Sequence, residues 1–83
     1  MNTSLVDSPP LARAQDVQIS GDALVVHLQD GRTITTPLSW FPRLRDAAPE
    51  QRARWRFIGP GTGIHWPDID EDISVASLLG LPD

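Results

Sequence analysis

The sequence predicts an α+β fold, in which a small antiparallel sheet packs with two to three short helices. Over residues 15–36, apolar residues alternate with polar ones, which is the period of a half-buried strand. Two glycine-containing turns interrupt this stretch, as expected for an N-terminal β-meander. After residue 37, prolines followed by acidic residues and arginines indicate short helices, and a glycine-rich turn joins further short strands.

The first hairpin of the meander is predicted at Gly21-Asp22, a good two-residue loop. This loop sets three cross-strand pairs: Ser20 with Ala23, Ile19 with Leu24, and Val17 with Val26. The apolar residues of the two strands then share one face of the sheet.

The second loop of the meander is predicted to hold three residues, Gln29 to Gly31. A two-residue loop would move Ile34 to the wrong face, because side chains alternate with a period of two. With Gly31 left-handed after a type I turn, Val26 pairs with Ile34 and His27 points to the other face. One continuous apolar face results, made of Val17, Ile19, Leu24, Val26, Leu28 and Ile34.

Short elements are expected in the rest of the chain. Pro37 ends the third strand, since it cannot donate to a ladder. Pro42 and Pro49 fit the first turns of two short helices, over 42–47 and from 49 towards 55. Residues 55–58 and 63–66 are predicted as strands, followed by an acidic connection over 67–73. A last helix, Val75 to Leu79, is capped by Ser74 or Asp72, with Gly80 at C′.

The length of 83 residues corresponds to one domain. We expect a flexible lead-in over 1–14, where Ser8-Pro9-Pro10 breaks any periodicity, and a single α+β domain over 15–83. The chain has no cysteine, which favours a reducing cytoplasm over secretion. No apolar run reaches the roughly 18 residues of a membrane span, and the N-terminus lacks the features of a signal peptide.

Charge is distributed unevenly along the chain, with a net value of −4. Residues 43–56 carry five arginines, whereas residues 57–83 carry five acidic residues and no arginine. The arginines could contact phosphate, because the guanidinium fork matches its geometry. The overall acidity argues against a dedicated nucleic-acid binder. We therefore expect the arginines to pair with the acidic C-terminal third.

The segment 65–72 holds the polar residues that are the best candidates for metal binding or catalysis. Asp68, Asp70 and Asp72 have the spacing that opens an EF-hand loop, but Ile73 stands where that loop needs glycine. Capping and solvation are the expected roles of these acids, with recognition of a partner or ion as the alternative. For His65 we expect a structural hydrogen bond to a carboxylate or carbonyl rather than a role as a base. We predict no catalytic residue, metal site or cofactor.

Three tryptophans, Trp40, Trp55 and Trp66, flank the ends of predicted elements. A tryptophan buries a large area and keeps an N–H that needs a partner. We expect the three to lock the helices onto the sheet. One of them exposed together with Phe41 would instead indicate an interface anchor.

Four ordered blocks carry a family resemblance: residues 37–44 with 49–52, residues 63–67, residues 70–74 and residues 78–80. With them the sequence resembles a bacterial family known only as domain of unknown function 2442, over about residues 15–80. The resemblance implies a compact α+β domain with an antiparallel sheet and no established activity. Some members resemble components of two-gene toxin–antitoxin-like pairs, and others carry a C-terminal helix-turn-helix domain, which we do not expect here.

These observations predict a binding or regulatory module for another small protein, with an antitoxin-like role as one form of it. A nucleic-acid accessory domain using the Arg43–Arg56 segment and a weak metal- or His65-dependent activity are the alternatives. The open strand edge of the meander also leaves a homodimer as an alternative. The candidate interaction residues are Trp40, Phe41, Arg43, Arg52, His65, Trp66, Asp68, Asp70 and Asp72.

Overall fold

The protein folds into two small antiparallel sheets with short helices, which confirms the predicted α+β class. The computed structural model describes residues 12–80. Three strands form the first sheet, in the order β1 (Ala14–Ser20), β2 (Ala23–Leu28) and β3 (Thr33–Pro37). Three more form the second sheet, in the order β4 (Arg56–Ile58), β5 (Gly63–Trp66) and β6 (Glu71–Ser74). Most of the predicted lead-in lies outside the described residues.

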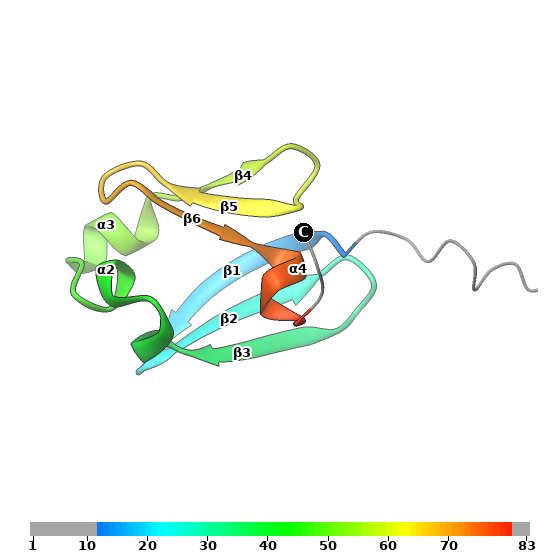
Figure 1. Ribbon diagram of the computed structural model, residues 1–83, viewed down its shortest axis with the longest axis horizontal. Coiled ribbons are helices and arrows are strands. Elements are labelled where there is room, and N and C mark those ends of the chain that lie inside the picture. The colour runs from blue at the N-terminus through cyan, green and yellow to red at the C-terminus, as the bar shows by residue number, and fades with distance from the viewer. Residues whose placement is uncertain (1–11, 81–83) are drawn as a thin grey trace, which may run out of the picture.

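The helices are all short. The 3₁₀ helix η1 (Leu38–Trp40), α2 (Pro42–Arg45) and α3 (Pro49–Ala53) follow β3, and α4 (Val75–Leu78) follows β6. Figure 1 shows α2 and α3 together at one end of the molecule, where they bridge the two sheets. None of these helices is long and apolar enough to cross a membrane.

The meander of β1, β2 and β3 has the predicted register. Val17 pairs with Val26, and Val26 pairs with Ile34. Gly31 has φ +95°, and its N–H bonds the carbonyl of Leu28 at 3.1 Å. The predicted three-residue loop with a left-handed glycine is therefore confirmed, and it sets which side chains face the core.

The helices after β3 begin where the prolines predict. Pro42 and Pro49 occupy first-turn positions of α2 and α3, where a missing N–H costs nothing. The Gln51 side chain accepts a hydrogen bond from the Ala48 N–H at 2.9 Å and so satisfies one free donor of α3. α3 ends at Ala53, so the chain is no longer helical when it reaches Arg56.

The predicted acidic connection over 67–73 is wrong in its second half, which forms strand β6. The turn covers only residues 67–70, where Asp70 takes a left-handed φ of +51° and reverses the chain. Glu71 then pairs with Trp66, and Ile73 pairs with Ile64. Acidic residues have low strand propensity, but on an edge strand their charge blocks further pairing.

The core lies between the two sheets and is closed by the helices. Among residues 12–80 it contains eleven buried apolar residues: Ala14, Val17, Leu24, Val26, Leu28, Leu38, Leu44, Ile64, Trp66, Ile73 and Val75. The sheets also meet where the turn between β4 and β5 touches the start of β1. There the Ala14 N–H donates to the Gly61 carbonyl at 2.7 Å, and a Cβ on Gly61 would lie 2.7 Å from the Ala14 oxygen.

The C-terminal helix α4 has the predicted caps. The Ser74 hydroxyl accepts a hydrogen bond from the Ser77 N–H at 3.3 Å, as an N-cap residue does. Gly80 has φ +74° and donates its N–H to Ser77, which closes the helix. Figure 1 shows α4 beside the first sheet, well away from α2 and α3.

Candidate functional site

The structure separates the predicted interaction residues into five places. Trp40 and Phe41 lie after β3, Arg43 and Arg52 lie on the helices α2 and α3, and Trp66 lies in the core. Asp68 and Asp70 lie in the turn before β6, whereas His65 and Asp72 lie side by side on the second sheet. Each place is built differently, and only some of them are exposed at the surface.

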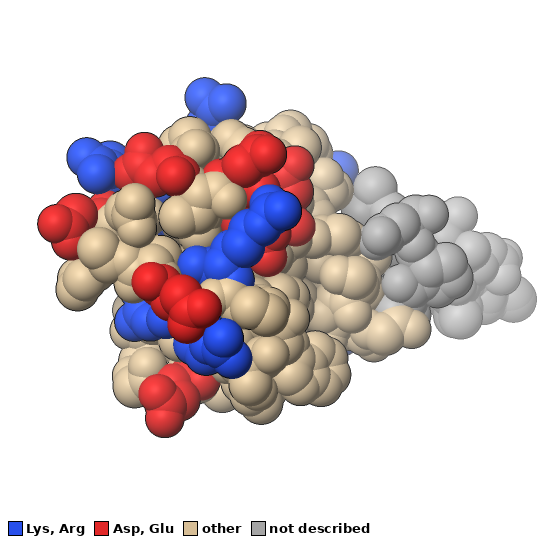
Figure 2. All heavy atoms as spheres, turned by 60° about the vertical axis from the view of Figure 1, so that its left-hand side comes forward, with Lys and Arg blue, Asp and Glu red and all other residues tan. Residues whose placement is uncertain are grey.

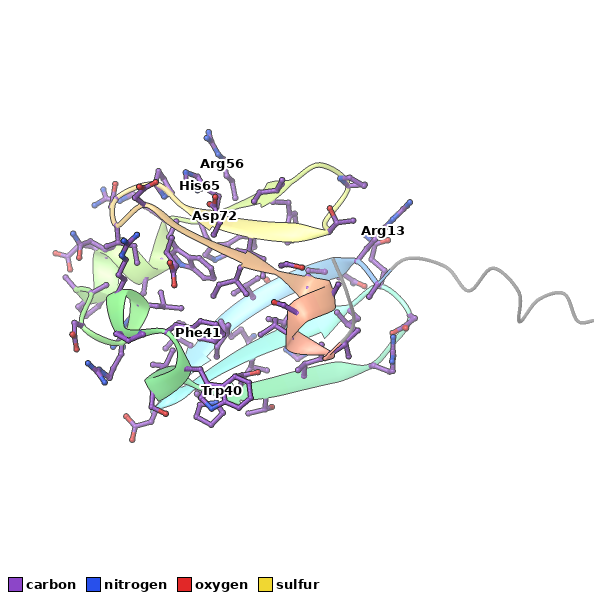
Figure 3. The ribbon with its side chains drawn as sticks, in the orientation of Figure 1. Arg13, Trp40, Phe41, Arg56, His65 and Asp72 are labelled. Atoms are coloured by element: carbon purple, nitrogen blue, oxygen red, sulfur yellow. The ribbon has the colours of Figure 1, made fainter. Side chains whose placement is uncertain are left out.

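Trp40 is exposed at 67% and is the larger of the two exposed large hydrophobic side chains in the described part of the chain. Its exposure follows from the 3₁₀ turn in which it lies. Leu38 at the start of that turn is buried, and its N–H donates to the Asp22 carbonyl at 2.8 Å. Figure 3 shows the Trp40 ring standing beside β3, away from the space between the sheets. The ring therefore adds nothing to the core.

Phe41 completes what we call the Trp40 surface, defined by Trp40 and Phe41. The Phe41 side chain is half-buried against the core, and its N–H donates to the Leu38 carbonyl at 2.8 Å. Phe41 also accepts the Arg45 N–H through its carbonyl at 2.8 Å and so connects η1 to α2. The exposed ring of Trp40 is thus attached to a backbone that is held on both sides.

Trp66, by contrast, presents no surface. Its side chain is fully buried, and its indole N–H donates to the Arg52 carbonyl at 3.1 Å. It fixes the end of α3 against β5, as the tryptophans were expected to do. We therefore remove Trp66 from the candidate interaction residues. Trp55 is intermediate, half-buried with its ring 5.0 Å from that of Phe57.

Most of the arginine segment is occupied by contacts within the chain. Arg54 pairs with Asp68 at 2.7 Å, as expected for the acidic C-terminal third. Arg43 donates to the Asp70 carbonyl at 2.8 Å, and Arg52 donates to the Leu44 carbonyl at 3.1 Å.

Arg45 bonds its neighbour Asp46 at 2.9 Å, and this hydrogen bond lowers the pKa of Asp46 below its ordinary value. Figure 2 shows basic and acidic side chains side by side over the helical end, rather than a field of one sign. The guanidinium groups of this end are therefore largely hydrogen-bonded within the chain, Arg45 and Arg54 to carboxylates, and Arg43 and Arg52 to carbonyls.

The second sheet carries one cross-strand row of polar side chains. Arg56 pairs with His65 and His65 pairs with Asp72, so the three lie in line across β4, β5 and β6 (Figure 3). The His65 Nδ1 is hydrogen-bonded to the Asp72 carboxylate, the structural bond that was expected. Arg56 ends the predicted arginine segment but was not among the candidate interaction residues, and its side chain forms no ion pair or hydrogen bond with other described residues.

Among residues 12–80, no group of three or more histidine, cysteine, aspartate or glutamate side chains could hold a metal ion. Asp68 and Asp70 face different partners, Arg54 through a carboxylate and Arg43 through a carbonyl. The turn before β6 is therefore tied to the arginine segment by contacts that hold the loop in place.

A groove that sequence reasoning did not find lies between β1 and α3. It has a volume of about 450 Å³ and is lined by Val17, Gln18, Ile19, Pro49, Arg52, Ala53 and Trp55. Of these, only Arg52 was among the candidate interaction residues predicted from the sequence. The available signal was the unpaired edge of the meander, but nothing local in the sequence places α3 next to that edge.

Comparison with protein-family models shows which family the chain belongs to. The model of the family described as "Protein of unknown function (DUF2442)" matches residues 14–81. The chain belongs to this family. The match confirms the resemblance seen in the sequence and begins at the first residue of β1.

A solved structure has a similar fold. A crystal structure of a protein of unknown function from Rhodospirillum rubrum ATCC 11170 is similar, with a TM-score of 0.70 and 26% sequence identity. The similarity covers 84% of this chain and 88% of that one. Comparison with curated proteins gave no match.

Proposed function

We propose that this protein is a small binding module whose partner is another protein, and that Trp40 is the residue that anchors the partner. The observation that carries the proposal is the 67% exposure of Trp40 beside the half-buried Phe41. Tryptophan is enriched among the few interface residues that supply most of the binding energy. An exposed tryptophan adds nothing to its own core, so its contribution comes when a partner covers it.

The backbone under Trp40 supports this role because it is held before binding. Leu38 is buried, and hydrogen bonds join Leu38 to Asp22 and Phe41 to Leu38. A side chain on a fixed backbone loses less conformational entropy on binding than one on a free loop. The matching partner offers an apolar pocket with a hydrogen-bond acceptor for the indole N–H.

The remaining contacts favour protein over nucleic acid as the partner. A phosphate-binding surface needs several free guanidinium groups, but Arg43, Arg45 and Arg54 donate to a carbonyl or to carboxylates of the same chain. The toxin–antitoxin-like pairs that the family resemblance implies are consistent with another small protein as the partner. An antitoxin-like role is the specific form of the proposal.

The proposal is tested by capture from the cells that express the protein, with nuclease added. Tagged wild-type protein is expected to retain one stoichiometric partner, which Trp40→Ser loses. Ile58→Ser is the matched control, because Ile58 is the other large apolar side chain that the described structure exposes, at 42%. Capture of the same protein by wild type and both variants, or capture of no protein, would contradict the role of Trp40.

A further inference from the structure

The groove between β1 and α3 is a second surface, separate from the Trp40 surface. We call it the edge groove, and its lining residues are those given above. We propose that it binds a single extended polypeptide segment, which adds a strand to the edge of β1 and carries a carboxylate side chain opposite Arg52. This inference goes beyond the proposed role of Trp40. If the edge groove binds no peptide, the proposed role of Trp40 is unaffected.

The groove follows the edge of β1 rather than one face of the sheet. Val17 and Ile19 point towards the core side of the sheet, and Gln18 points to the opposite side. All three line the groove. A space that touches residues from both faces of one strand must lie beside the strand, where another strand would pair.

The backbone at this edge is ready to pair. The two-residue loop makes Ser20 and Ala23 a hydrogen-bonded pair, and such pairs alternate along an antiparallel ladder. The N–H and C=O groups of Val17 and Ile19 therefore point away from β2. Within residues 12–80 these groups form no hydrogen bond with other groups. They offer two donors and two acceptors to an added strand.

The start of the same edge is already closed. The Ala14 N–H donates to the Gly61 carbonyl at 2.7 Å, so the turn between β4 and β5 occupies the edge there. The open part of the edge is thus limited to the length of β1 that the groove follows. Figure 1 shows β1 running from that turn towards the helical end of the molecule.

The wall of the groove opposite β1 favours a single extended segment over a second copy of the chain. Pro49, Ala53 and Trp55 stand across from the strand edge, so the space is bounded on its far side. A second copy pairing through its own β1 would bring β2 and β3 of its sheet against this wall. A single extended segment has no strand on its far side and fits between the walls, with its apolar side chains against Trp55 and Ala53.

Charge fixes the chemistry of one position of that segment. Arg52 is the charged side chain in the groove lining, and its hydrogen bonds go to the neutral carbonyls of Leu44 and Arg45. No carboxylate of residues 12–80 forms an ion pair with Arg52, although its charge, after the hydrogen bond from Arg45, helps to lower the pKa of Asp46. A glutamate or aspartate on the bound segment would complement Arg52, whereas a lysine would be repelled.

The test uses a synthetic eight-residue peptide of alternating valine and threonine with one central glutamate. A second peptide has lysine in place of that glutamate. Binding to the full chain is followed by NMR, with amide hydrogen exchange as the readout. We expect the Val17 and Ile19 amides to exchange fast in the free protein and to become protected on binding. We expect the glutamate peptide to bind about fivefold more tightly than the lysine peptide.

A pair of variants controls for the groove. Ala53→Glu adds bulk and a negative charge to an exposed wall position, and it is expected to abolish binding, whereas Ala53→Ser retains it. Absence of binding at millimolar peptide, or protection confined to other strands, would overturn the proposal. Protection of Val17 and Ile19 that rises with protein concentration alone would assign the edge to a second copy and overturn it equally.

Discussion

Replacing Gly61 by alanine should reveal how strongly the two sheets depend on one close contact. Gly61 has φ +104°, and a side chain in that region costs about 1–3 kcal/mol. The added Cβ would also lie 2.7 Å from the Ala14 oxygen, a backbone atom that cannot swing aside. Overpacking of this kind costs a further 1–3 kcal/mol or so. We therefore expect the free energy of unfolding to fall by about 2–6 kcal/mol.

Gly31→Ala is the matched control, because Gly31 has a similar φ of +95° but no atom within 4 Å of an added Cβ. It should lose only the conformational part, about 1–3 kcal/mol. Urea unfolding followed by tryptophan fluorescence measures both. With a slope near 1 kcal/mol per molar urea, the two midpoints should differ by about 1 M or more. Equal midpoints would refute the contact between Gly61 and β1.

Two further predictions concern the core and the second turn of the meander. Trp66→Phe should lower the free energy of unfolding by about 2–4 kcal/mol, because it removes buried apolar area and leaves the Arg52 carbonyl without its hydrogen-bond donor. A decrease below about 1 kcal/mol, measured by urea unfolding, would contradict this prediction. The Arg32 backbone N–H, with the Arg32 side chain, lowers the pKa of Asp30. A carboxylate with a lowered folded pKa stabilises the fold above its unfolded pKa, and that contribution is lost as the pH falls through the folded value. Asp30→Asn should therefore be less stable than wild type at pH 7, and the gap in urea midpoint should close below about pH 4; a gap that persists in acid would argue against the assigned cause.

The meander could be predicted in detail because its information is local. Gly21 and Gly31 specify the two loops, and the alternation of apolar residues fixes the register once the loops are known. The prolines at 42 and 49 likewise mark helix starts by a property of their own backbone. In these segments the sequence and the structure give the same answer.

Strand β6 could not be predicted in the same way. Glu71 and Asp72 are poor strand formers, and they are extended because β5 offers them a ladder across a turn that Asp70 closes. The information lies in the pairing partner and not in the residues of the strand.

The candidate site was predictable only in part, for the same reason. Trp40, Trp55 and Trp66 look alike in the sequence, since each flanks an element end. Trp40 is exposed because Leu38 takes the buried position of η1. Trp66 is buried, with its indole N–H hydrogen-bonded to a carbonyl of α3. The edge groove is lined by residues far apart in the sequence, such as Val17 and Ala53, so no local sequence pattern predicts it.

The most direct test of the central claim is the affinity of the captured partner for three purified proteins: wild type, Trp40→Ser and Ile58→Ser. Titration calorimetry gives the dissociation constants. If Trp40 anchors the partner, its loss should weaken binding by about thirtyfold or more, and the loss of Ile58 should change binding by less than about threefold. Equal affinities of wild type and Trp40→Ser would contradict the claim that this exposed ring is the binding anchor.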